Sequence, residues 1–302
     1  MNKRLLLIMN PNAGQKTGKK HLADILSLFC KEQYVPTVFM TTAQGDGCTL
    51  AKAHAADADL VVCVGGDGTF NEVVSGVIEA GVDKPIGYIP CGSTNDFASG
   101  LKLSKSPLQA AKDILAGQPL TYDVGRFGQR YFTYVASFGA FTRVSYATPQ
   151  NLKNALGHLA YILEGIKDLP NIHPVHMRFE TADAVFEDDY IFGAVSNSTS
   201  LGGVLTIDPA TVDMNDGLFE LLLIKFPKNA NELSECIRAL QEKNYDSPML
   251  TFHSTNKLTV TTSETVDWTL DGEHEAGQPL VLIENCRDAF RLIVNQKENA
   301  RE

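Results

Sequence analysis

Strand-like runs alternate with amphipathic stretches along the first part of the chain. The runs cover residues 4–9, 37–40, 60–64 and 85–89. Short segments that are almost continuously apolar are typical of parallel strands buried on both faces. Between the first two runs, apolar residues recur at helical spacing from Leu22 to Phe29. The pattern predicts a doubly wound α/β domain with right-handed crossovers over residues 1–124.

The pattern changes after Tyr122, where strand-like segments begin to follow one another. They cover residues 122–127, 131–136, 175–180, 190–196, 218–225, 257–262 and 266–270. Turn signals such as Asn215-Asp216-Gly217 separate most of them, and two helices are expected at 152–166 and 231–243. We therefore expect an antiparallel, β-rich second domain over residues 125–287. The segment 288–302 is expected to return to the first domain.

Composition and charge limit the class of protein and of partner. A chain of 302 residues suits two domains or one large one. Its 26 Lys and Arg against 36 Asp and Glu argue against nucleic acid as a partner, because phosphate-binding surfaces need clustered cations. The apolar runs 5–9 and 221–224 are far shorter than the roughly 20 residues of a membrane span. We expect no signal peptide and no transmembrane segment. Six cysteines without a C-x-x-C pair favour reduced thiols and a cytosolic protein.

The strongest motif is the segment 61–72, in which an apolar strand leads into Gly65, Gly66 and Gly68. Thr69 and Glu72 have the spacing of a capping box, which predicts that a helix begins at Thr69. Glycines at such a junction let phosphate oxygens approach backbone amides at the positive end of a helix. The alternative is a turn whose glycines relieve strained dihedral angles and bind nothing. The combination of strand, glycine-rich turn and helix favours an anion site.

Two further polar loops leave strands of the same domain, over residues 10–14 and 90–98. Ligands of open parallel sheets bind where loops leave the carboxyl ends of the strands. We therefore expect the three loops to form a nucleotide site, although each alone could be an Asx-turn or a helix cap. Neither standard phosphate loop fits. The Walker A spacing is absent, and Asn71 occupies the third glycine position of a dinucleotide fingerprint.

Together these loops resemble a known family. The segments Asn10-Pro11 to Gly14, Gly65-Gly66-Asp67-Gly68-Thr69 and Pro90-Cys91-Gly92-Ser93-Thr94-Asn95-Asp96-Phe97-Ala98 are similar to motifs of the diacylglycerol kinase catalytic domain family. That family also includes sphingosine and ceramide kinases, and the chain looks most like its soluble bacterial diacylglycerol kinases. The resemblance extends through the second half, over 122–125, 208–217 and 270–273. One departure is Cys91-Gly92-Ser93-Thr94, where members usually have Gly-Thr followed by a variable residue.

The resemblance implies a fold and a nucleotide site. The expected fold is a NAD kinase- or phosphofructokinase-like first domain and an antiparallel β-sandwich second domain, with the active site between them. ATP would bind the first domain, and lipid and Mg²⁺ the second. The implied nucleotide contacts are Asn10, Pro11, Asn12, Ala13, Gly14, Thr41, Gly66, Asp67, Gly68, Thr69, Phe70, Asn71, Glu72 and Thr94.

The family match assigns the catalytic base to Glu273, in the segment Leu270-Asp271-Gly272-Glu273. A carboxylate that takes the proton of an attacking alcohol contributes on the order of 10²–10⁴ in rate. The alternative is that Asp271-Gly272 is an ordinary hairpin turn and Glu273 is merely solvated. Asp67, in the phosphate loop, is the second catalytic candidate. It could hold a metal, orient the hydroxyl or accept its proton.

A bound Mg²⁺ is implied at Asp213, Asp216 and the main chain of Leu218. Residues 180–224 contain nine Asp or Glu and no Lys or Arg, and hard cations prefer oxygen ligands. The alternative from spacing alone is that Asn215-Asp216-Gly217 simply turns the chain. The ion would be structural and distinct from the Mg²⁺ carried by ATP.

The expected activity is ATP-dependent phosphorylation of diacylglycerol to phosphatidic acid, in the cytoplasm and in transient contact with the inner face of the membrane. Local cations would make that contact, and apolar residues around 138–146 would hold the acyl chains. The cations are Lys16, Lys19, Lys20, Lys153 and Lys167. The alternatives are another lipid alcohol such as phosphatidylglycerol or a sphingoid base, a NAD kinase, a dehydrogenase, or a nucleotide sensor without catalysis. A homodimer is left open.

Overall fold

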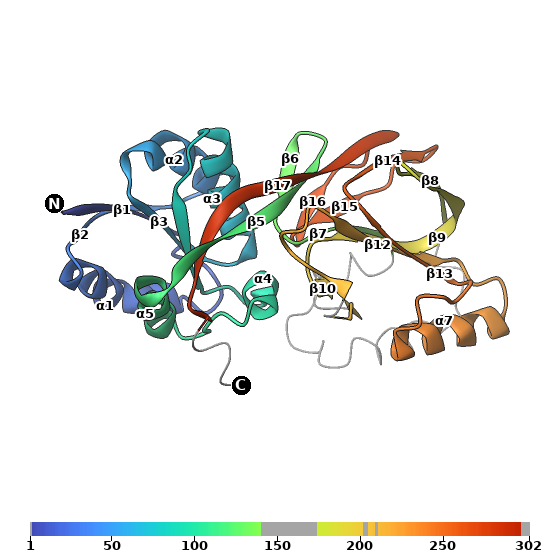
Figure 1. The fold of residues 1–302 in the computed structure, drawn as a ribbon, viewed down its shortest axis with the longest axis horizontal. Coiled ribbons are helices and arrows are strands. Elements are labelled where there is room, and N and C mark those ends of the chain that lie inside the picture. The colour runs from blue at the N-terminus through green and yellow to red at the C-terminus, as the bar shows by residue number, and fades with distance from the viewer. Residues whose placement is uncertain (1, 140–173, 202–204, 209–210, 297–302) are drawn as a thin grey trace. The chain divides into compact units, whose positions relative to one another are not determined.

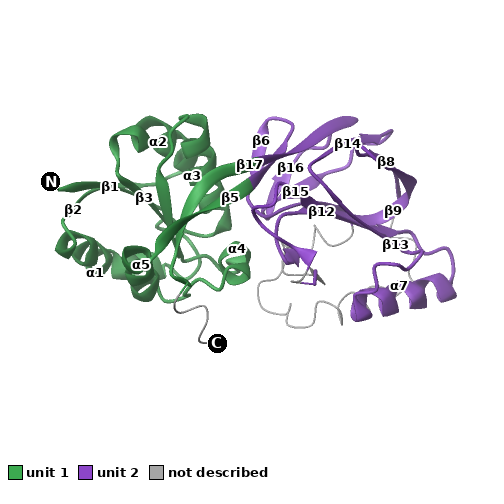
Figure 2. Ribbon diagram, viewed as in Figure 1, with its two compact units in different colours: residues 1–123, 287–302 green, residues 124–286 purple. Residues whose placement is uncertain are grey.

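The computed structural model describes residues 2–139, 174–201, 205–208 and 211–296. The chain divides into two compact units, shown in Figure 2. Unit 1 comprises Met1–Asp123 and Arg287–Glu302, and unit 2 comprises the residues from Val124 to Cys286.

Unit 1 is built on a parallel sheet with the strand order β4-β3-β1-β2, extended by β17 at β4. Its strands are β1 (Lys3–Met9), β2 (Tyr34–Met40), β3 (Leu60–Gly65) and β4 (Pro85–Pro90), and β17 is Leu280–Val294. Its helices are α1 (Thr17–Lys31), α2 (Asp46–His54), the 3₁₀ turn η1 (Ala55–Asp57), α3 (Asp67–Glu79), α4 (Asp96–Gly100) and α5 (Pro107–Ala116).

Both faces of this sheet are covered, which explains why its strands read as apolar runs. Leu7 and Val62 pack in one core with Ile25 and Phe29 of α1 and with Ile114 of α5. Helices α2 and α3 pack together on the opposite side of the sheet (Figure 1). The predicted doubly wound α/β fold is confirmed.

Unit 2 is antiparallel and rich in strands, as predicted. The sheet order is β16-β15-β7-β9-β8-β14-β17, with β12 paired to β9 and β13. Its strands are β5 (Gln118–Phe127), β6 (Arg130–Phe132), β7 (Val135–Gly139), β8 (Val175–Glu180), β9 (Val185–Ser196), β10 (Ser200–Leu201), β11 (Leu205–Thr206), β12 (Phe219–Lys225), β13 (Leu250–Thr255), β14 (Lys257–Thr262), β15 (Trp268–Leu270) and β16 (Glu273–Glu275), and its one described helix is α7 (Ala230–Glu242). The core includes Phe138, Phe179, Leu221 and Trp268. Strands β5 and β17 pair with each other and run from one unit into the other.

Several details of the predicted elements are wrong, among them the start of β9, which lies at Val185 and not at Tyr190. The segment 131–136 is not one strand, because the chain leaves β6 after Phe132 and enters β7 at Val135. Strand β13 was not predicted, and β17 begins ten residues before the predicted segment 290–294. The predicted helix 152–166 lies outside the described residues, as does most of the segment 138–146.

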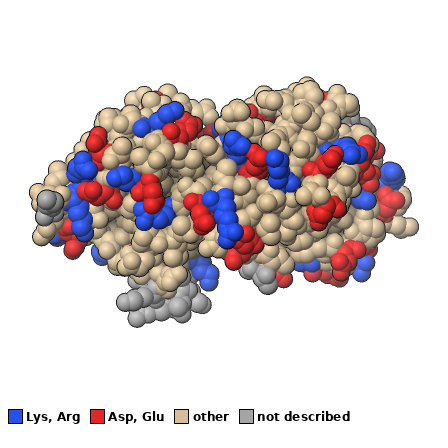
Figure 3. Space-filling view, turned by 45° about the horizontal axis from the view of Figure 1, so that its top comes forward, with Lys and Arg blue, Asp and Glu red and all other residues tan. Residues whose placement is uncertain are grey.

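The surface of the described residues is mixed in charge. On the face in Figure 3, Lys and Arg side chains lie among Asp and Glu side chains, and pairs such as Lys52–Glu79 are in direct contact at 2.9 Å. The six cysteines, all in described segments, are free thiols. In the described parts of the chain, no helix combines the length and apolar character needed to cross a bilayer.

Candidate active site

Three loops at the carboxyl ends of β1, β3 and β4 meet in unit 1. The amide of Asn10 donates to the carbonyl of Val64 at 2.9 Å, and the amide of Cys91 donates to that of Gly65 at 2.7 Å. The side-chain amide of Asn10 also donates to the Thr69 hydroxyl at 3.2 Å. The loops that the sequence singled out are therefore bonded to one another at one edge of the sheet.

Glycine is required where these loops approach most closely. Gly14 has φ +49°, and a Cβ atom there would lie 2.4 Å from the Cys91 carbonyl oxygen. A Cβ atom at Gly92 would lie 2.6 Å from the Cα atom of Gly66. Any side chain at these positions would separate the loops.

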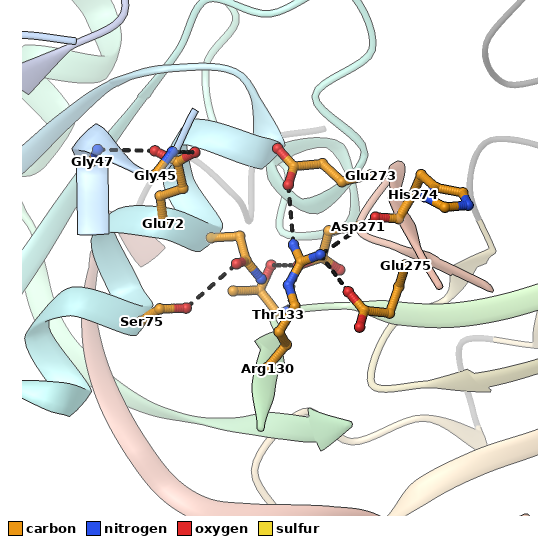
Figure 4. A network of polar contacts seen from close by, with 11 residues as sticks. Gly45, Gly47, Glu72, Ser75, Arg130, Thr133, Asp271, Glu273, His274 and Glu275 are labelled. Carbon is orange, nitrogen blue, oxygen red and sulfur yellow. Dashed lines mark hydrogen bonds and ion pairs between the residues drawn. The ribbon is translucent and has the colours of Figure 1, made fainter. Parts of the chain in front are cut away.

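The predicted capping box is wrong. Helix α3 begins at Asp67, with Gly66 as its N-cap and without a side-chain cap. The Glu72 carboxylate instead accepts hydrogen bonds from the amides of Gly45 and Gly47, at 2.7 and 2.9 Å, at the start of α2 (Figure 4). Glu72 thus caps a neighbouring helix, since carboxylates are favoured at helix N-termini.

Asp67 is nearly buried, with 9% of its surface exposed, and its carboxylate is held from two sides. Oδ2 accepts a hydrogen bond from the amide of Asp96 at 2.8 Å, at the start of α4. Oδ1 lies 3.4 Å from the hydroxyl of Tyr88, which stacks on Phe70. The first residue of α3 is therefore fixed against the first residue of α4.

The remaining residues that were predicted to contact the nucleotide differ in their exposure to solvent. Asn12 and Thr94 are exposed, and the amide of Asn12 bonds to the side chain of Asn10. Thr41 is mostly buried directly after β2, and its amide donates to the Met9 carbonyl at 2.8 Å. Phe70 is fully buried, so only its main chain is available to a ligand. The others are placed as follows: Pro11, Ala13 and Gly14 lie in the loop after β1, and Gly68 and Asn71 lie in the first turns of α3.

In unit 2, Asp271 and Gly272 form the two-residue turn between β15 and β16, with φ +50° and +86°. This is the hairpin turn that the sequence offered as the alternative. The side chain of Asp271 also makes buried hydrogen bonds. Its buried carboxylate accepts hydrogen bonds from the amide and hydroxyl of Thr133 and from the amides of Tyr134 and Val135. These contacts also account for the break between β6 and β7. Burial raises the pKa of Asp271, and the same hydrogen bonds oppose that shift.

Glu273 is the first residue after this turn, and its side chain is not simply solvated. Its Oε2 lies 3.2 Å from Nη2 of Arg130, whose Nη1 lies 2.6 Å from Oε2 of Glu275 (Figure 4). All three side chains are partly buried. Arg130 therefore bridges the two carboxylates of β16. Sequence reasoning missed Arg130, because no local motif marks a contact over 143 positions.

At the predicted metal site, both carboxylates form local turns. Oδ1 of Asp213 accepts from the amide of Asn215 at 3.3 Å, and Oδ1 of Asp216 accepts from the amide of Leu218 at 2.8 Å. The Leu218 carbonyl accepts from the side-chain amide of Asn285 at 3.0 Å. Among the described residues, no three His, Cys, Asp or Glu side chains are grouped closely enough to hold a metal by themselves.

One carboxylate close to that turn in the sequence is buried and incompletely hydrogen-bonded. Glu220, the second residue of β12, is 2% exposed, and its Oε2 has no hydrogen-bond partner in the part of the chain that the structure describes. Burial first, and then the charges of Asp216 and Asp213, raise the pKa of Glu220 to about 8. Asp213, Asp216 and Glu220 all lie in described segments, so the structure does not assemble these carboxylates into a metal site.

Comparison with known proteins agrees with this architecture. Residues 4–127 match the family model described as diacylglycerol kinase catalytic domain, and residues 135–294 match the YegS C-terminal NAD kinase beta sandwich-like domain. A diacylglycerol kinase of Bacillus subtilis is 32% identical over 99% of both chains, and one of Staphylococcus saprophyticus is 30% identical over 92% of both.

Solved structures show the same fold. The crystal structure of a diacylglycerol kinase from Bacillus anthracis superposes with a TM-score of 0.71 at 22% identity, covering 98% of each chain. A second crystal structure from that organism gives 0.79 at 24% identity, covering 98% of this chain and 96% of the other. With matching family models over both halves and relatives aligned along nearly its whole length, the chain belongs to the diacylglycerol kinase family.

Proposed function

We propose that this protein transfers the γ-phosphoryl group of ATP to the free hydroxyl of diacylglycerol and releases ADP and phosphatidic acid. The observation that carries the proposal is the meeting of three loops at the N-terminus of α3, with glycines where backbones touch. Such a site offers backbone amides and a helix dipole to phosphate oxygens. The curated relatives named diacylglycerol kinase support the lipid acceptor.

In the proposed reaction, the hydroxyl oxygen of diacylglycerol attacks the γ-phosphorus, and the bond from that phosphorus to the β–γ bridging oxygen breaks. The hydroxyl proton passes to the carboxylate of Glu273, which Arg130 and the Asp271 turn hold in place. Phosphoryl transfer depends mainly on positioning and charge neutralisation. The fixed carboxylate of Asp67 is assigned to the ATP-bound metal or to the attacking hydroxyl.

Mg²⁺ bound with ATP would neutralise charge on the phosphates as the transferred group leaves. The nucleotide-facing residues of this chain are the loop 10–14, Thr41, the start of α3 from Gly66 to Glu72, and Thr94. In the described structure Glu72 acts indirectly, because its carboxylate is occupied by two amides of the α2 N-terminus.

We further propose that the enzyme acts in the cytoplasm and meets its substrate by transient contact with the membrane. Lys16, Lys19 and Lys20 are exposed around the N-terminal end of α1, and none has an ion-pair partner within the described residues. Cations at a helix N-terminus oppose the helix dipole, so their placement is not explained by helix stability. Attraction to an anionic surface would contribute about 1 kcal/mol of binding free energy for each of these lysines.

The test is transfer of radiolabel from [γ-³²P]ATP to lipids in mixed micelles. Diacylglycerol, phosphatidylglycerol, a sphingoid base and ceramide are compared, with NAD as a soluble acceptor. Glu273→Ala and Asp67→Ala serve as inactive controls. The proposal is supported if the wild-type protein transfers label to phosphatidic acid and both variants do not.

Three other outcomes contradict it. Label in a different lipid retains the chemistry and changes the substrate. Label in NAD, or ATP binding without transfer to any acceptor, replaces the lipid kinase with a NAD kinase or a nucleotide sensor.

A further inference from the structure

Unit 1 contains a cavity of about 430 Å³ at the side of β4 where its pairing with β17 ends, at Ile86. Tyr88 of β4 and Asn295, the residue after β17, line it together with α5 and the segment that joins α4 to α5. Among the described residues that line it, none belongs to the loops assigned to ATP. Its volume lies within the range of small-ligand sites.

Two cations line this cavity. Lys102 and Lys105 are exposed, and neither side chain forms a salt bridge or a hydrogen bond within the described residues. Ser99 and Ser104 add two hydroxyl groups to the lining. In a chain of net charge −10, two neighbouring unpaired lysines create a local attraction for anions. Ammonium groups and hydroxyls together are suited to the several oxygens of a phosphate group.

One carboxylate also lines the cavity, and it restricts the kind of anion. Oδ1 of Asp113 accepts hydrogen bonds from the side-chain amides of Gln109 at 3.0 Å and of Asn295 at 3.1 Å. Its Oδ2 makes no hydrogen bond or ion pair within the described residues. A carboxylate repels a bare phosphate ion but accepts hydrogen bonds from hydroxyl groups. The lining therefore favours a phosphate ester that carries hydroxyls.

The rest of the lining is largely apolar. Leu103, Ile114 and Ile293 offer surface against which the carbon skeleton of such an ester can pack. Tyr88 also lines the cavity, and its hydroxyl lies 3.4 Å from Oδ1 of Asp67. An occupant would therefore contact a residue that touches the second catalytic candidate.

We propose that this cavity binds the phosphate ester of a small polyol, with the phosphate at Lys102 and Lys105 and a hydroxyl at Oδ2 of Asp113. This site goes beyond the proposed function and does not depend on it. The same chemical group is present in a free polyol phosphate and in the glycerophosphate headgroup of a lipid, and the experiment distinguishes these two sources.

The first measurement is calorimetric titration of the full chain with glycerol 3-phosphate, at about 0.15 M salt so that long-range attraction is screened. The variant Lys102→Gln/Lys105→Gln is expected to bind about 10- to 100-fold more weakly than wild type. Lys31→Gln/Lys112→Gln, the same change at two exposed lysines outside the lining, is the matched control and retains wild-type affinity. Binding is expected to persist with a saturating non-hydrolysable ATP analogue.

A second variant tests the role of the carboxylate. Asp113→Asn keeps an oxygen for Gln109 and Asn295 and places an NH₂ group where Oδ2 was. Wild type is expected to bind glycerol 3-phosphate more tightly than inorganic phosphate. In Asp113→Asn this preference is expected to fall at least about 10-fold, because the hydroxyl acceptor and the repulsion of phosphate are both lost. An unchanged preference overturns the proposed orientation of the ligand.

Sedimentation with phosphatidylglycerol vesicles, compared with phosphatidylcholine vesicles, identifies the source. Weaker sedimentation of Lys102→Gln/Lys105→Gln than of its matched control assigns the site to a lipid headgroup. Equal sedimentation of the two, with calorimetric binding intact in wild type, assigns it to a free ester. Three results overturn the proposal: wild-type affinity for glycerol 3-phosphate in Lys102→Gln/Lys105→Gln, displacement by the ATP analogue, or a wild type that binds neither probe.

Discussion

The amide of Asp96 donates a hydrogen bond to Oδ2 of Asp67 at 2.8 Å. Each residue is the first of its helix, so this contact joins the N-termini of α3 and α4. The loops after β3 and β4 are therefore held together by a side chain that is also the second catalytic candidate. Its structural and catalytic roles can be separated by substitution.

Asp67→Asn is expected to fold, because the side-chain oxygen of Asn can still accept from Asp96 in a site of the same size. We expect kcat to fall at least about 100-fold, since the negative charge is lost. Steady-state kinetics with diacylglycerol micelles measure this. Tyr88→Phe, which removes the longer 3.4 Å contact to Oδ1, is the control and should stay within a few-fold of wild type. An equal loss of kcat in Asp67→Asn and Tyr88→Phe would indicate that Asp67 has a structural and not a catalytic role.

Glu273→Gln is expected to lower kcat by about 10²–10⁴ with little change in the KM for ATP, because the proton acceptor is lost while the nucleotide loops are untouched. Glu275→Gln is the matched control, since Glu275 is the second carboxylate bound by Arg130. It should retain most activity. Similar defects in both variants would indicate that the ion pairs with Arg130, rather than a base at position 273, limit the rate.

Asp271→Asn is expected to destabilise the protein by about 3 kcal/mol, because an amide NH₂ would face backbone donors that now point at a carboxylate. Urea unfolding followed by tryptophan fluorescence reports directly on this region, since Trp268 is the only tryptophan and begins β15. Asp267→Asn, at an exposed carboxylate nearby, should shift the midpoint very little. An unchanged midpoint for Asp271→Asn would show that the four contacts contribute no net stability.

Gly14→Ala is expected to raise the KM for ATP and to destabilise the protein by about 2–3 kcal/mol, combining left-handed strain with overpacking. Gly128→Ala separates the two causes. Gly128 has φ +58°, but a Cβ atom there meets nothing within 4 Å, so only the strain of about 1 kcal/mol applies. Denaturant unfolding and ATP kinetics of both variants test this. A wild-type KM for ATP in Gly14→Ala would show that the loop 10–14 does not contribute to nucleotide binding.

Elements with a continuous apolar signal were predicted within one or two residues, as β1, β3 and β4 illustrate. Helix α3 was misplaced because the T-x-x-E spacing is a local signal, whereas Glu72 is used by α2. Strand β13 mixes Thr, His and Ser with its apolar residues, so no strict alternation marks it. The break in 131–136 depends on Asp271, far along the chain, and no local pattern reveals it.

The site residues also divide into those with a local sequence signal and those that depend on distant contacts. Glycine-rich loops can be read from the sequence because a close backbone approach demands glycine at fixed positions. Arg130 could not be found this way, since its role depends on two carboxylates of a strand far along the chain.

Strand β17 has a consequence for how the protein matures on the ribosome. Leu280 to Glu284 pair with β14, whereas Arg291 and Leu292 pair in parallel with β4, which is translated far earlier. The sheet of unit 1 therefore cannot pair β4 with β17 until residue 292 has been translated, and this edge of β4 stays open to wrong pairing in the meantime. A nascent chain arrested before residue 287 should be a chaperone substrate rather than an independently folded module.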